Sequence, residues 1–331
     1  MSIVPGLGVL VVHRLLGFFA ILLLAAAAAR AQPGDVTAFT LLRMEPSGRV
    51  AALAGAAGAL DPSDVSTAFQ NPALVGSSME GMLSVSYLNH LTDVKAGFVS
   101  YATSAGRFGT LMGGVRYLTY GTFERADANG LRDGTTFGAY DAVLTVGLGR
   151  EYNERLHYGA SLHWVTSRID DAGAGAFAAD AGVYYYMPGE QLGLSLSVHN
   201  IGVTLNSFGE TKDDLPVDLR IGASKRLSHL PLHLTVMGYN LHNFEGSGGS
   251  FADDVLEHVA IGAEFILGPS LRARLGYNHR RHQDLKTDSR LDLAGVGIGF
   301  GIALNRFRFD YAYNDWSSLG GIHHLTVQTS L

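Results

Sequence analysis

Histidines and serines recur at alternate positions in two segments of the chain, where they could assemble a hydrolytic site. The set comprises His157, Ser161, His163, Ser195, Ser197 and His199. A histidine can act as the general base for a serine nucleophile when a third group orients its ring. Serine and histidine are also the ordinary lining of a water-filled lumen, and no motif links these positions. We therefore predict no catalytic residues and no enzymatic activity.

Three pairs of adjacent aspartates could supply oxygen ligands to a divalent cation. The pairs are Asp170-Asp171, Asp213-Asp214 and Asp253-Asp254. Such carboxylates can bind calcium, or the divalent ions that bridge lipopolysaccharide. Solvation of loop charges accounts for them without any ion, so we predict no metal site and no cofactor. The basic stretch 278–282 poses the same choice, because its arginines could bind anionic sugar-phosphate groups or be solvated.

Charged residues also fall within segments that alternate between apolar and polar positions. Arg220, Arg272 and Arg274 occupy the same alternating face as Asp180 and Asp218. If that face met lipid, an arginine at the middle of the bilayer would cost about 2–4 kcal/mol. We therefore predict that this face lines a lumen, where ion pairs among these residues would explain them.

The alternation itself runs from about Met82 to Leu331 and predicts β-strands. Between 158 and 165, for example, Tyr158, Leu162 and Trp164 alternate with small or polar residues. Successive side chains of a strand point to opposite faces, so each segment has one apolar and one wetter face. The pattern predicts fourteen strands, near 82–89, 95–102, 109–119, 138–149, 157–167, 176–187, 191–200, 217–227, 231–241, 257–267, 271–279, 292–302, 307–314 and 322–331.

The connections between these strands alternate in length. Short turns are expected near 151–155, 187–190, 228–230, 268–270 and 305–306, and long polar loops at 120–137, 201–216, 242–256, 280–291 and 315–321. This asymmetry and the even strand number are typical of outer-membrane barrels, whose short turns face the periplasm. A soluble all-β protein is the alternative, but its strands usually have about five or six residues, against about ten here. We predict an all-β fold, a transmembrane antiparallel β-barrel of about fourteen strands.

The composition favours a membrane barrel and excludes several other classes. Of the 331 residues, 47% are hydrophobic and only 16% are charged, whereas about 25% charged is usual for soluble domains. The net charge of −6 gives no reason to expect nucleic acid as a partner. The absence of cysteine excludes disulfides and thiolate metal sites.

The first 31 residues have the organisation of a secretory signal peptide. His13 and Arg14 precede the apolar stretch 15–29, and small residues flank a cleavage site after Ala31. A membrane-spanning anchor is the alternative, but the stretch is shorter than the roughly 20 residues that a span needs. We predict a signal peptide at 1–31, an N-terminal hatch segment at 32–81 and a barrel at 82–331, exported to the cell outer membrane.

The predicted hatch segment is rich in alanine and glycine and does not alternate. Ser63 or Asp64 could cap a short helical turn within it. The segment 294–302 carries glycine at every second position, which leaves room on its inner face for another backbone. We predict that the hatch segment packs there as a plug. The alternative role of these glycines is to ease the curvature of the barrel.

Motifs in this segment resemble a known family. Residues 47–55 and 68–74 flank a short loop, and the second stretch contains Asn71, Pro72 and Ala73. They resemble the N-terminal hatch of the FadL-like outer-membrane family, in which Asn71, Pro72 and Ala73 correspond to a structural hatch motif. With residues 83–90 and 198–202, the chain is more narrowly similar to the PorQ branch, a component of the type IX secretion system.

The resemblance implies a fourteen-stranded barrel that works beside PorU-, PorV- and PorZ-like proteins. That assembly attaches secreted cargo to surface lipopolysaccharide, and the PorQ branch would hold the PorZ-like surface protein at the membrane. We therefore expect a docking barrel surrounded by outer-membrane lipid and lipopolysaccharide. The predicted loops 120–137, 201–216 and 242–256 would form its docking face.

The wider family implies an alternative function, the transport of hydrophobic small molecules. A transporter of this kind needs an apolar pocket in its lumen. The predicted inner faces are mostly glycine, serine, threonine, histidine and arginine, with Met112, Met237 and Tyr239 as exceptions. The sequence therefore favours docking over transport.

Overall fold

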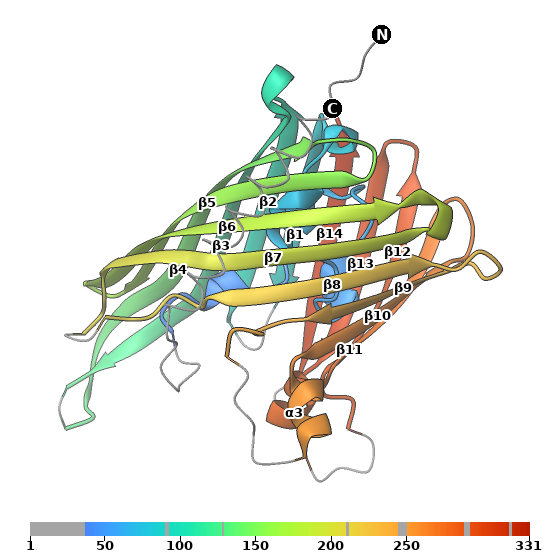
Figure 1. Ribbon diagram of the computed structural model, residues 1–331. Coiled ribbons are helices and arrows are strands. Elements are labelled where there is room, and N and C mark those ends of the chain that lie inside the picture. The colour runs from blue at the N-terminus through green and yellow to red at the C-terminus, as the bar shows by residue number, and fades with distance from the viewer. Residues whose placement is uncertain are drawn as a thin grey trace.

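The computed structural model describes residues 37–89, 93–127, 129–209, 212–243, 250–287, 292–317 and 320–331. These residues form a closed antiparallel barrel of fourteen strands (Figure 1), in which β1 pairs with both β2 and β14. The predicted all-β barrel and the fourteen strand positions are confirmed. The signal peptide predicted at 1–31 lies outside the described residues.

The strands run in sequence order around the barrel. Their bounds are β1 Met82–Asn89, β2 Lys95–Ser104, β3 Thr110–Ala126, β4 Arg132–Glu151, β5 Leu156–Ile169, β6 Ala172–Met187, β7 Leu192–Asn206, β8 Asp218–Arg226, β9 Leu232–Gly238, β10 Val259–Ile266, β11 Leu271–Asn278, β12 Val296–Leu304, β13 Phe307–Asp315 and β14 Gly321–Ser330. Short turns connect β2 to β3, β4 to β5 and each later pair of this kind, at the end where the chain terminates. Because short turns face the periplasm in outer-membrane barrels, we call this the periplasmic end and the opposite one the outer end.

The alternation in the sequence becomes the two surfaces of the barrel wall. On β5, Leu162 and Trp164 are 68% and 54% exposed, whereas His163 between them is buried. The same alternation places Ile298 and Phe300 of β12 outside, with 48% and 44% exposed. The outward surface is therefore apolar and the inward surface polar, which confirms the predicted faces.

The outer end departs from the sequence prediction. The expected long loop 120–137 is mostly strand, because β3 and β4 continue as a hairpin in which Thr122 pairs with Gly138 and Ala126 with Arg132. Asp170 and Asp171, whose charges the sequence assigns to a loop, form a two-residue turn between β5 and β6. Alternation within 120–137 is interrupted by a register shift between Thr119 and Thr122, so a period-two reading loses the strand there.

Two short helices also lie in connections that the sequence presented as irregular loops. Helix α3, Phe251–Glu257, begins at a capping box in which Ser250 and Asp253 bond to each other's backbone. Helix α4, His279–Leu285, is capped by Asn278. Serine, aspartate and asparagine favour these positions because their side chains accept bonds from free amides of the first turn. No helix within the described ranges is long and apolar enough to cross a membrane.

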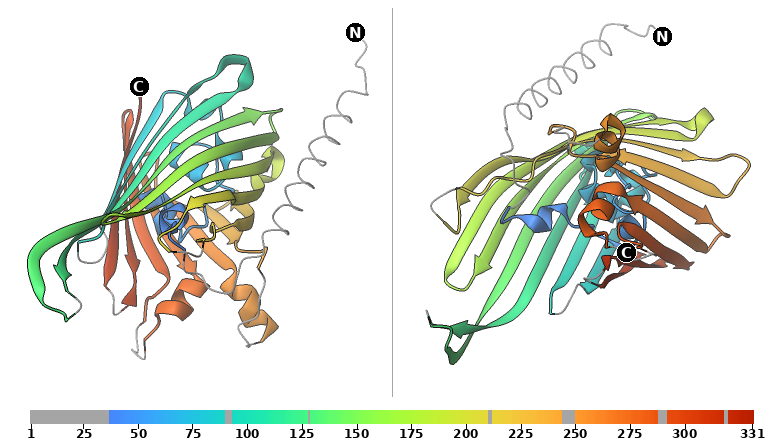
Figure 2. Two further views of the ribbon diagram at one scale, coloured as in Figure 1. Left: turned by 90° about the vertical axis from the view of Figure 1, so that its left-hand side faces the viewer. Right: turned by 90° about the horizontal axis from the view of Figure 1, so that it is seen from below.

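Residues 37–81, which we call the luminal segment, lie inside the barrel (Figure 2). The segment contains η1 Thr40–Arg43, α2 Gly48–Ala52, η2 Val65–Phe69, η3 Pro72–Leu74 and η4 Ser77–Met79, and two further 3₁₀ turns, η5 Gly106–Phe108 and η6 Pro188–Glu190, lie outside it at the periplasmic end. Its small residues are almost fully buried, including Ala51, Ala52 and Ala57. Alanine and glycine let the backbone approach the barrel wall closely. The segment that does not alternate in the sequence is therefore the one that fills the lumen.

The lipid-facing surface can be tested at Leu162, which lies near the middle of β5 and is 68% exposed. We expect Leu162→Arg to lower the free energy of unfolding by about 2–4 kcal/mol, because a charge would enter the bilayer. Urea titration of the protein refolded in phospholipid vesicles measures this change. Leu131→Arg is the control, because Leu131 is also 68% exposed but lies at the tip of the β3–β4 hairpin. Its cost should stay within about 0.5 kcal/mol, and equal costs at both sites would contradict the assigned faces.

Candidate functional sites in the barrel lumen

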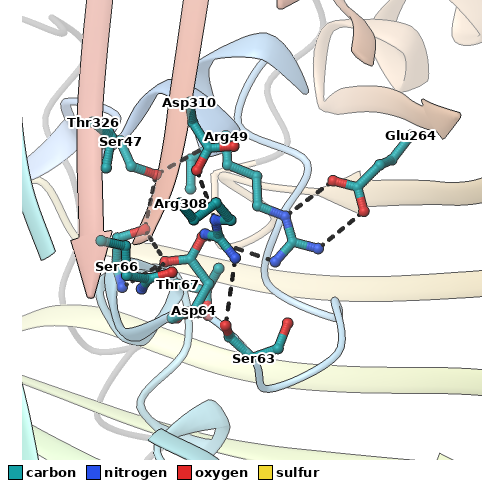
Figure 3. A network of polar contacts seen from close by, with 12 residues as sticks. Ser47, Arg49, Ser63, Asp64, Ser66, Thr67, Glu264, Arg308, Asp310 and Thr326 are labelled. Carbon is teal, nitrogen blue, oxygen red and sulfur yellow. Dashed lines mark hydrogen bonds and ion pairs between the residues drawn. The ribbon is translucent and has the colours of Figure 1, made fainter. Parts of the chain in front are cut away.

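Six charged side chains fix the luminal segment to the barrel wall by ion pairs, and we call them the charged ring. They are Arg49 and Asp64 of the luminal segment, Glu264 of β10, Arg274 of β11, and Arg308 and Asp310 of β13. Ser47 caps α2 by accepting a hydrogen bond from the amide of Val50. This cap orients the first turn of α2, from which the Arg49 side chain extends toward Glu264 (Figure 3).

Two wall carboxylates of the ring each contact two guanidinium groups. Glu264 accepts from Nε of Arg49 at 3.1 Å and from Nε of Arg274 at 2.6 Å. Asp310 lies 2.6 Å from Nη1 of Arg274 and 2.8 Å from Nε of Arg308. Removing one partner of a buried ion pair typically costs about 3–5 kcal/mol. The luminal segment must therefore bring Arg49 to this position on the wall and to no other.

Asp64 closes the ring from the luminal segment. Its Oδ2 pairs with Nη2 of Arg308 and lies 3.8 Å from Nη1 of Arg49. Its Oδ1 accepts from the hydroxyl of Ser66 at 2.6 Å and from Gln328 at 3.2 Å. Burial alone would raise the pKa of this carboxyl, but the two guanidinium groups and the bonds from Ser66 lower it to about 2. The sequence anticipated Asp64 as a cap of η2, which it is, but not its ion pairs.

The motif Asn71, Pro72 and Ala73 lies where the luminal segment presses against β5 and β6. Asn71 caps η3, accepting from the amide of Ala73 at 2.9 Å, and donates to the carbonyl of Gly58 at 3.2 Å. A Cβ at Gly159 of β5 would clash with the carbonyl of Pro72. The neighbouring strand leaves a similar gap, because a Cβ at position 182 would clash with the Asn71 side chain. The motif therefore occupies space that glycines of the wall leave open.

The glycine column of β12 makes room for the luminal segment at two of its four positions. A Cβ at Gly297 would lie 2.6 Å from the carbonyl oxygen of Ala51, and one at Gly299 would lie 2.7 Å from Cβ of Ala52. At Gly301 the space is taken instead by Arg274 and Asp310 of the charged ring. The remaining glycine, at 295, belongs to the turn before β12. The prediction that the luminal segment packs against this column is thus right for Gly297 and Gly299. At Gly295 the close backbone is that of Asn278 and His282 instead, and at Gly301 the nearest atoms belong to side chains.

The histidines and serines considered for catalysis converge on Asp180 of β6. His163 and His199 both contact its Oδ2, at 2.9 and 3.0 Å, and the hydroxyl of Ser197 lies 2.8 Å from Nε2 of His199. Contacts therefore run from Ser197 to His199 and from His199 to Asp180, as they do in the Ser-His-Asp triad of a hydrolase. All three side chains are buried, however, and they line none of the three cavities of the lumen described below.

Ser161 and His157, also considered for catalysis, contact only buried neighbours in the contacts that the structure gives them. Ser161 lies 3.4 Å from Nε2 of His163, whereas His157 packs edge-on against Tyr184, away from that cluster. Ser161 and Ser197 are only 4% and 2% exposed among the described residues, which leaves little room for a substrate beside either hydroxyl. The cluster instead satisfies buried polar groups on adjacent strands, as buried networks must.

The aspartate pairs are distributed over three separate connections. Asp170 forms an ion pair with Arg125 in the turn between β5 and β6, and Asp253 belongs to the capping box of α3. In the ranges that the structure describes, no group of three or more histidine, cysteine, aspartate or glutamate side chains could hold a metal ion. In the basic stretch, Arg281 forms an ion pair with Glu45 of the luminal segment. This ion pair connects α4 to the luminal segment.

Apolar side chains gather in a cavity of about 530 Å³ near the outer end of the lumen. Its apolar lining comprises Met44, Leu88, Val94, Leu118, Trp316 and Ile322. Beside it lies a cavity of about 280 Å³ lined by Met237, Tyr239 and charged residues. The expectation of a mostly polar inner face is therefore wrong at this end. The inward positions near the outer ends of β1, β3 and β14 carry apolar residues, because η1 buries its own apolar residues against them.

Sequence reasoning missed most of the charged ring. The wall residues Glu264, Arg308 and Asp310 stand at inward positions of their strands, so the alternation could have placed them in the lumen. The pairing of Glu264 with Arg49, however, joins positions 215 residues apart in the sequence. Only the folded barrel brings these strands together around the luminal segment.

Known proteins with a similar fold are found among solved structures. No protein-family model matches the chain, and no curated protein matches it. Among solved structures, a FadL homologue of Pseudomonas aeruginosa shares 12% identity over 86% of this chain and 98% of its own, with a TM-score of 0.51. The toluene transporter TodX of Pseudomonas putida shares 11% identity over 88% of this chain and 96% of its own, with a TM-score of 0.50.

A deletion mutant of TodX, described as a monoaromatic hydrocarbon channel, gives a TM-score of 0.52 at 11% identity, over 86% of this chain and 98% of its own. At identities this low, the structural likeness establishes a shared fold and nothing beyond it. The chain therefore has the fold of the FadL-type outer-membrane barrels, and that fold fits a location in the outer membrane. Of these neighbours, TodX is described as a toluene transporter and a monoaromatic hydrocarbon channel.

The charged ring should make anchorage of the luminal segment depend on pH. The pKa of Asp64 is about 2 in the fold and 3.8 for an unperturbed aspartate. Since the folded pKa is the lower one, the stabilisation is complete above about pH 4 and is lost as the pH falls toward 2. The total is about 2 kcal/mol. Hydrogen exchange of residues 47–67, compared between pH 5 and pH 2.5, measures this loss.

Other carboxylates also take up protons between pH 5 and pH 2.5, and the variant Asp64→Asn separates their effect on hydrogen exchange from that of Asp64. The variant should exchange faster than the wild type at pH 5, and it should show a smaller change on acidification. An identical pH response in both proteins would contradict the role of Asp64.

Proposed function

We propose that this protein is a plugged outer-membrane barrel that holds a PorZ-like surface protein of the type IX secretion system, beside PorU- and PorV-like partners. The resemblance of residues 68–74, 83–90 and 198–202 to the PorQ branch supports this choice of partner. The observation that supports a docking role is the hairpin formed by the outer parts of β3 and β4. This hairpin, residues 120–138, projects past the last pair between β2 and β3, Lys95 with Thr119.

The length of these strands exceeds what a membrane requires. A strand of about 9–11 residues crosses a bilayer, whereas β3 has 17 residues and β4 has 20. At about 3.3 Å per residue, β4 extends for roughly 65 Å. About half of it therefore stands outside the membrane and forms a rigid ledge at the outer end, seen at the lower left of Figure 1.

The ledge presents apolar and aromatic side chains to its surroundings. Phe123 and Leu131 are 43% and 68% exposed, and Phe123 stacks on Phe137 with ring centroids 5.4 Å apart. Arg125 lies 5.8 Å over the Phe137 ring and pairs with Asp170. Aromatic residues and arginine are the residue types that most often dominate protein interfaces. Such groups in water favour a protein partner at this position.

The filled lumen gives independent support to docking. A third cavity, at the periplasmic end of the lumen, shares no lining residue with either of the two outer cavities. Residues 50–53 of the luminal segment are fully buried between them. An open channel is not needed by a barrel whose task is to position a surface protein.

Recovery of the partner in mild detergent tests this proposal. We expect the tagged wild-type protein to retain a PorZ-like protein, and Phe123→Ser combined with Leu131→Ser to reduce its recovery at least tenfold. Phe108→Ser is the control, because Phe108 is 57% exposed but lies in η5 at the periplasmic end. Failure of the wild type to recover any attachment-complex component, or equal recovery by the ledge variant, would contradict the proposal.

The apolar outer cavity favours a second candidate function, the uptake of a hydrophobic small molecule. Its volume of about 530 Å³ lies within the range of ligand pockets. TodX, whose fold is similar, is a toluene transporter. In this chain the ligand would bind between the barrel wall and η1, and passage to the periplasm would require the luminal segment to move.

Binding of a radiolabelled long-chain fatty acid to the purified barrel tests this candidate. If the outer cavity is the site, Ile322→Ser should weaken binding about tenfold, because it puts a hydroxyl into the apolar lining. Val198→Ser is the control, since Val198 is 2% exposed and Ile322 3%, and Val198 lies outside the cavity. Absence of saturable binding by the wild type would remove this function.

A further inference from the structure

A separate cavity of about 290 Å³ lies at the periplasmic end of the lumen. Its lining residues Arg226, Ser270 and Ala303 adjoin the short turns that follow β8, precede β11 and follow β12. The cavity therefore faces the periplasm. Neither docking at the outer end nor uptake into the outer cavity uses it.

Five arginines line this cavity, and two of them are not engaged in ion pairs. Arg49, Arg274 and Arg308 belong to the charged ring. Arg226 and Arg272 form no ion pair with any carboxylate in the described part of the chain, and Arg272 donates only to the carbonyls of Gly268 and Leu271. Their charges are free to act on a ligand in the cavity.

Arg49 provides a second, independent sign of an absent anion. Its side chain is only 5% exposed, yet Nη1 has no hydrogen-bond partner among the described residues. The nearest carboxylate oxygen, on Asp64, is 3.8 Å away, which is too long for a hydrogen bond. A buried donor left unpaired is costly, and a ligand oxygen in this cavity would satisfy it.

The carboxylates of the site do not cancel its positive charge. Asp61 and Glu264 also line the cavity, and Asp64 and Asp310 pair with its arginines. Five arginines therefore face four carboxylates, and His233 adds a further donor. Because each ring carboxylate is shared by two arginines, nitrogen atoms of the guanidinium groups remain available.

We propose that this cavity binds a phosphate-type oxyanion from the periplasmic side. Guanidinium groups recognise phosphate through paired N–H donors, and several arginines around one small cavity suit an anion with three or more oxygen atoms. The shared chemistry is that of inorganic phosphate and of the phosphomonoester headgroup of a lipid. Bound phosphate would also strengthen the contact between the charged ring and the turns at the periplasmic end.

Calorimetric titration of the full-length protein in zwitterionic detergent, at constant ionic strength, tests the site. The probes are inorganic phosphate and short-chain phosphatidic acid, with chloride as the negative control. We expect saturable binding of a phosphate probe, weakened at least tenfold by Arg226→Gln combined with Arg272→Gln. These two arginines lie outside the charged ring, so the luminal segment keeps its anchors.

The matched control is Arg107→Gln combined with Arg306→Gln. It removes the same charge at the same end of the barrel, but both side chains lie outside the cavity, each over the ring of the next phenylalanine. Its affinity should stay within twofold of the wild type. Tighter binding of phosphatidic acid assigns the site to a lipid headgroup, and tighter binding of inorganic phosphate assigns it to the free anion. No saturable binding by the wild type, or equal loss in both double variants, would overturn the proposal.

Discussion

The ion pairs between the luminal segment and the barrel wall hold the interior of this protein together. The inward face of the wall carries Glu264, Arg274 and Asp310, all at most 5% exposed. The luminal segment supplies Arg49 and Asp64, which complete the pairs and close the charged ring with Arg308. Without the segment, Glu264 would lose one of its two guanidinium partners and Arg308 one of its two carboxylate partners, and the loss of a partner from a buried ion pair is costly. Wall and luminal segment are therefore complementary parts of one core.

Steric fit reinforces this electrostatic constraint. The luminal segment is narrow because it consists largely of alanine and glycine, and the wall is hollowed by its own glycines where the backbones meet. Gly297 and Gly299 face α2 of the segment, and Gly159 faces Pro72. Asn71 then bonds to the backbone of both the segment and β6. Charge sets where the segment docks, and the glycines set how closely it approaches.

The same filling divides the lumen into two chemically different ends. Apolar residues around Leu118 and Ile322 surround the outer cavity, while Arg226 and Arg272 give the periplasmic cavity its positive charge. Between them the luminal segment leaves no shared lining. The two proposed functions are therefore independent of each other, because the ledge of β3 and β4 lies at the outer end and the arginine-lined cavity lies at the periplasmic end.

The alternation of side chains is enough to predict the barrel, because a period of two indicates directly which residues meet lipid and which meet the lumen. It locates all fourteen strands and the inward direction of His163, Arg274 and Asp180. Which inward residues contact one another depends on how the strands pair and close, and the alternation carries no information about that. The ion pair of Arg49 with Glu264 joins positions 215 residues apart, and its geometry follows from strand register and closure of the sheet. The extended β3–β4 hairpin was likewise hidden, since a register shift breaks the period that reveals a strand.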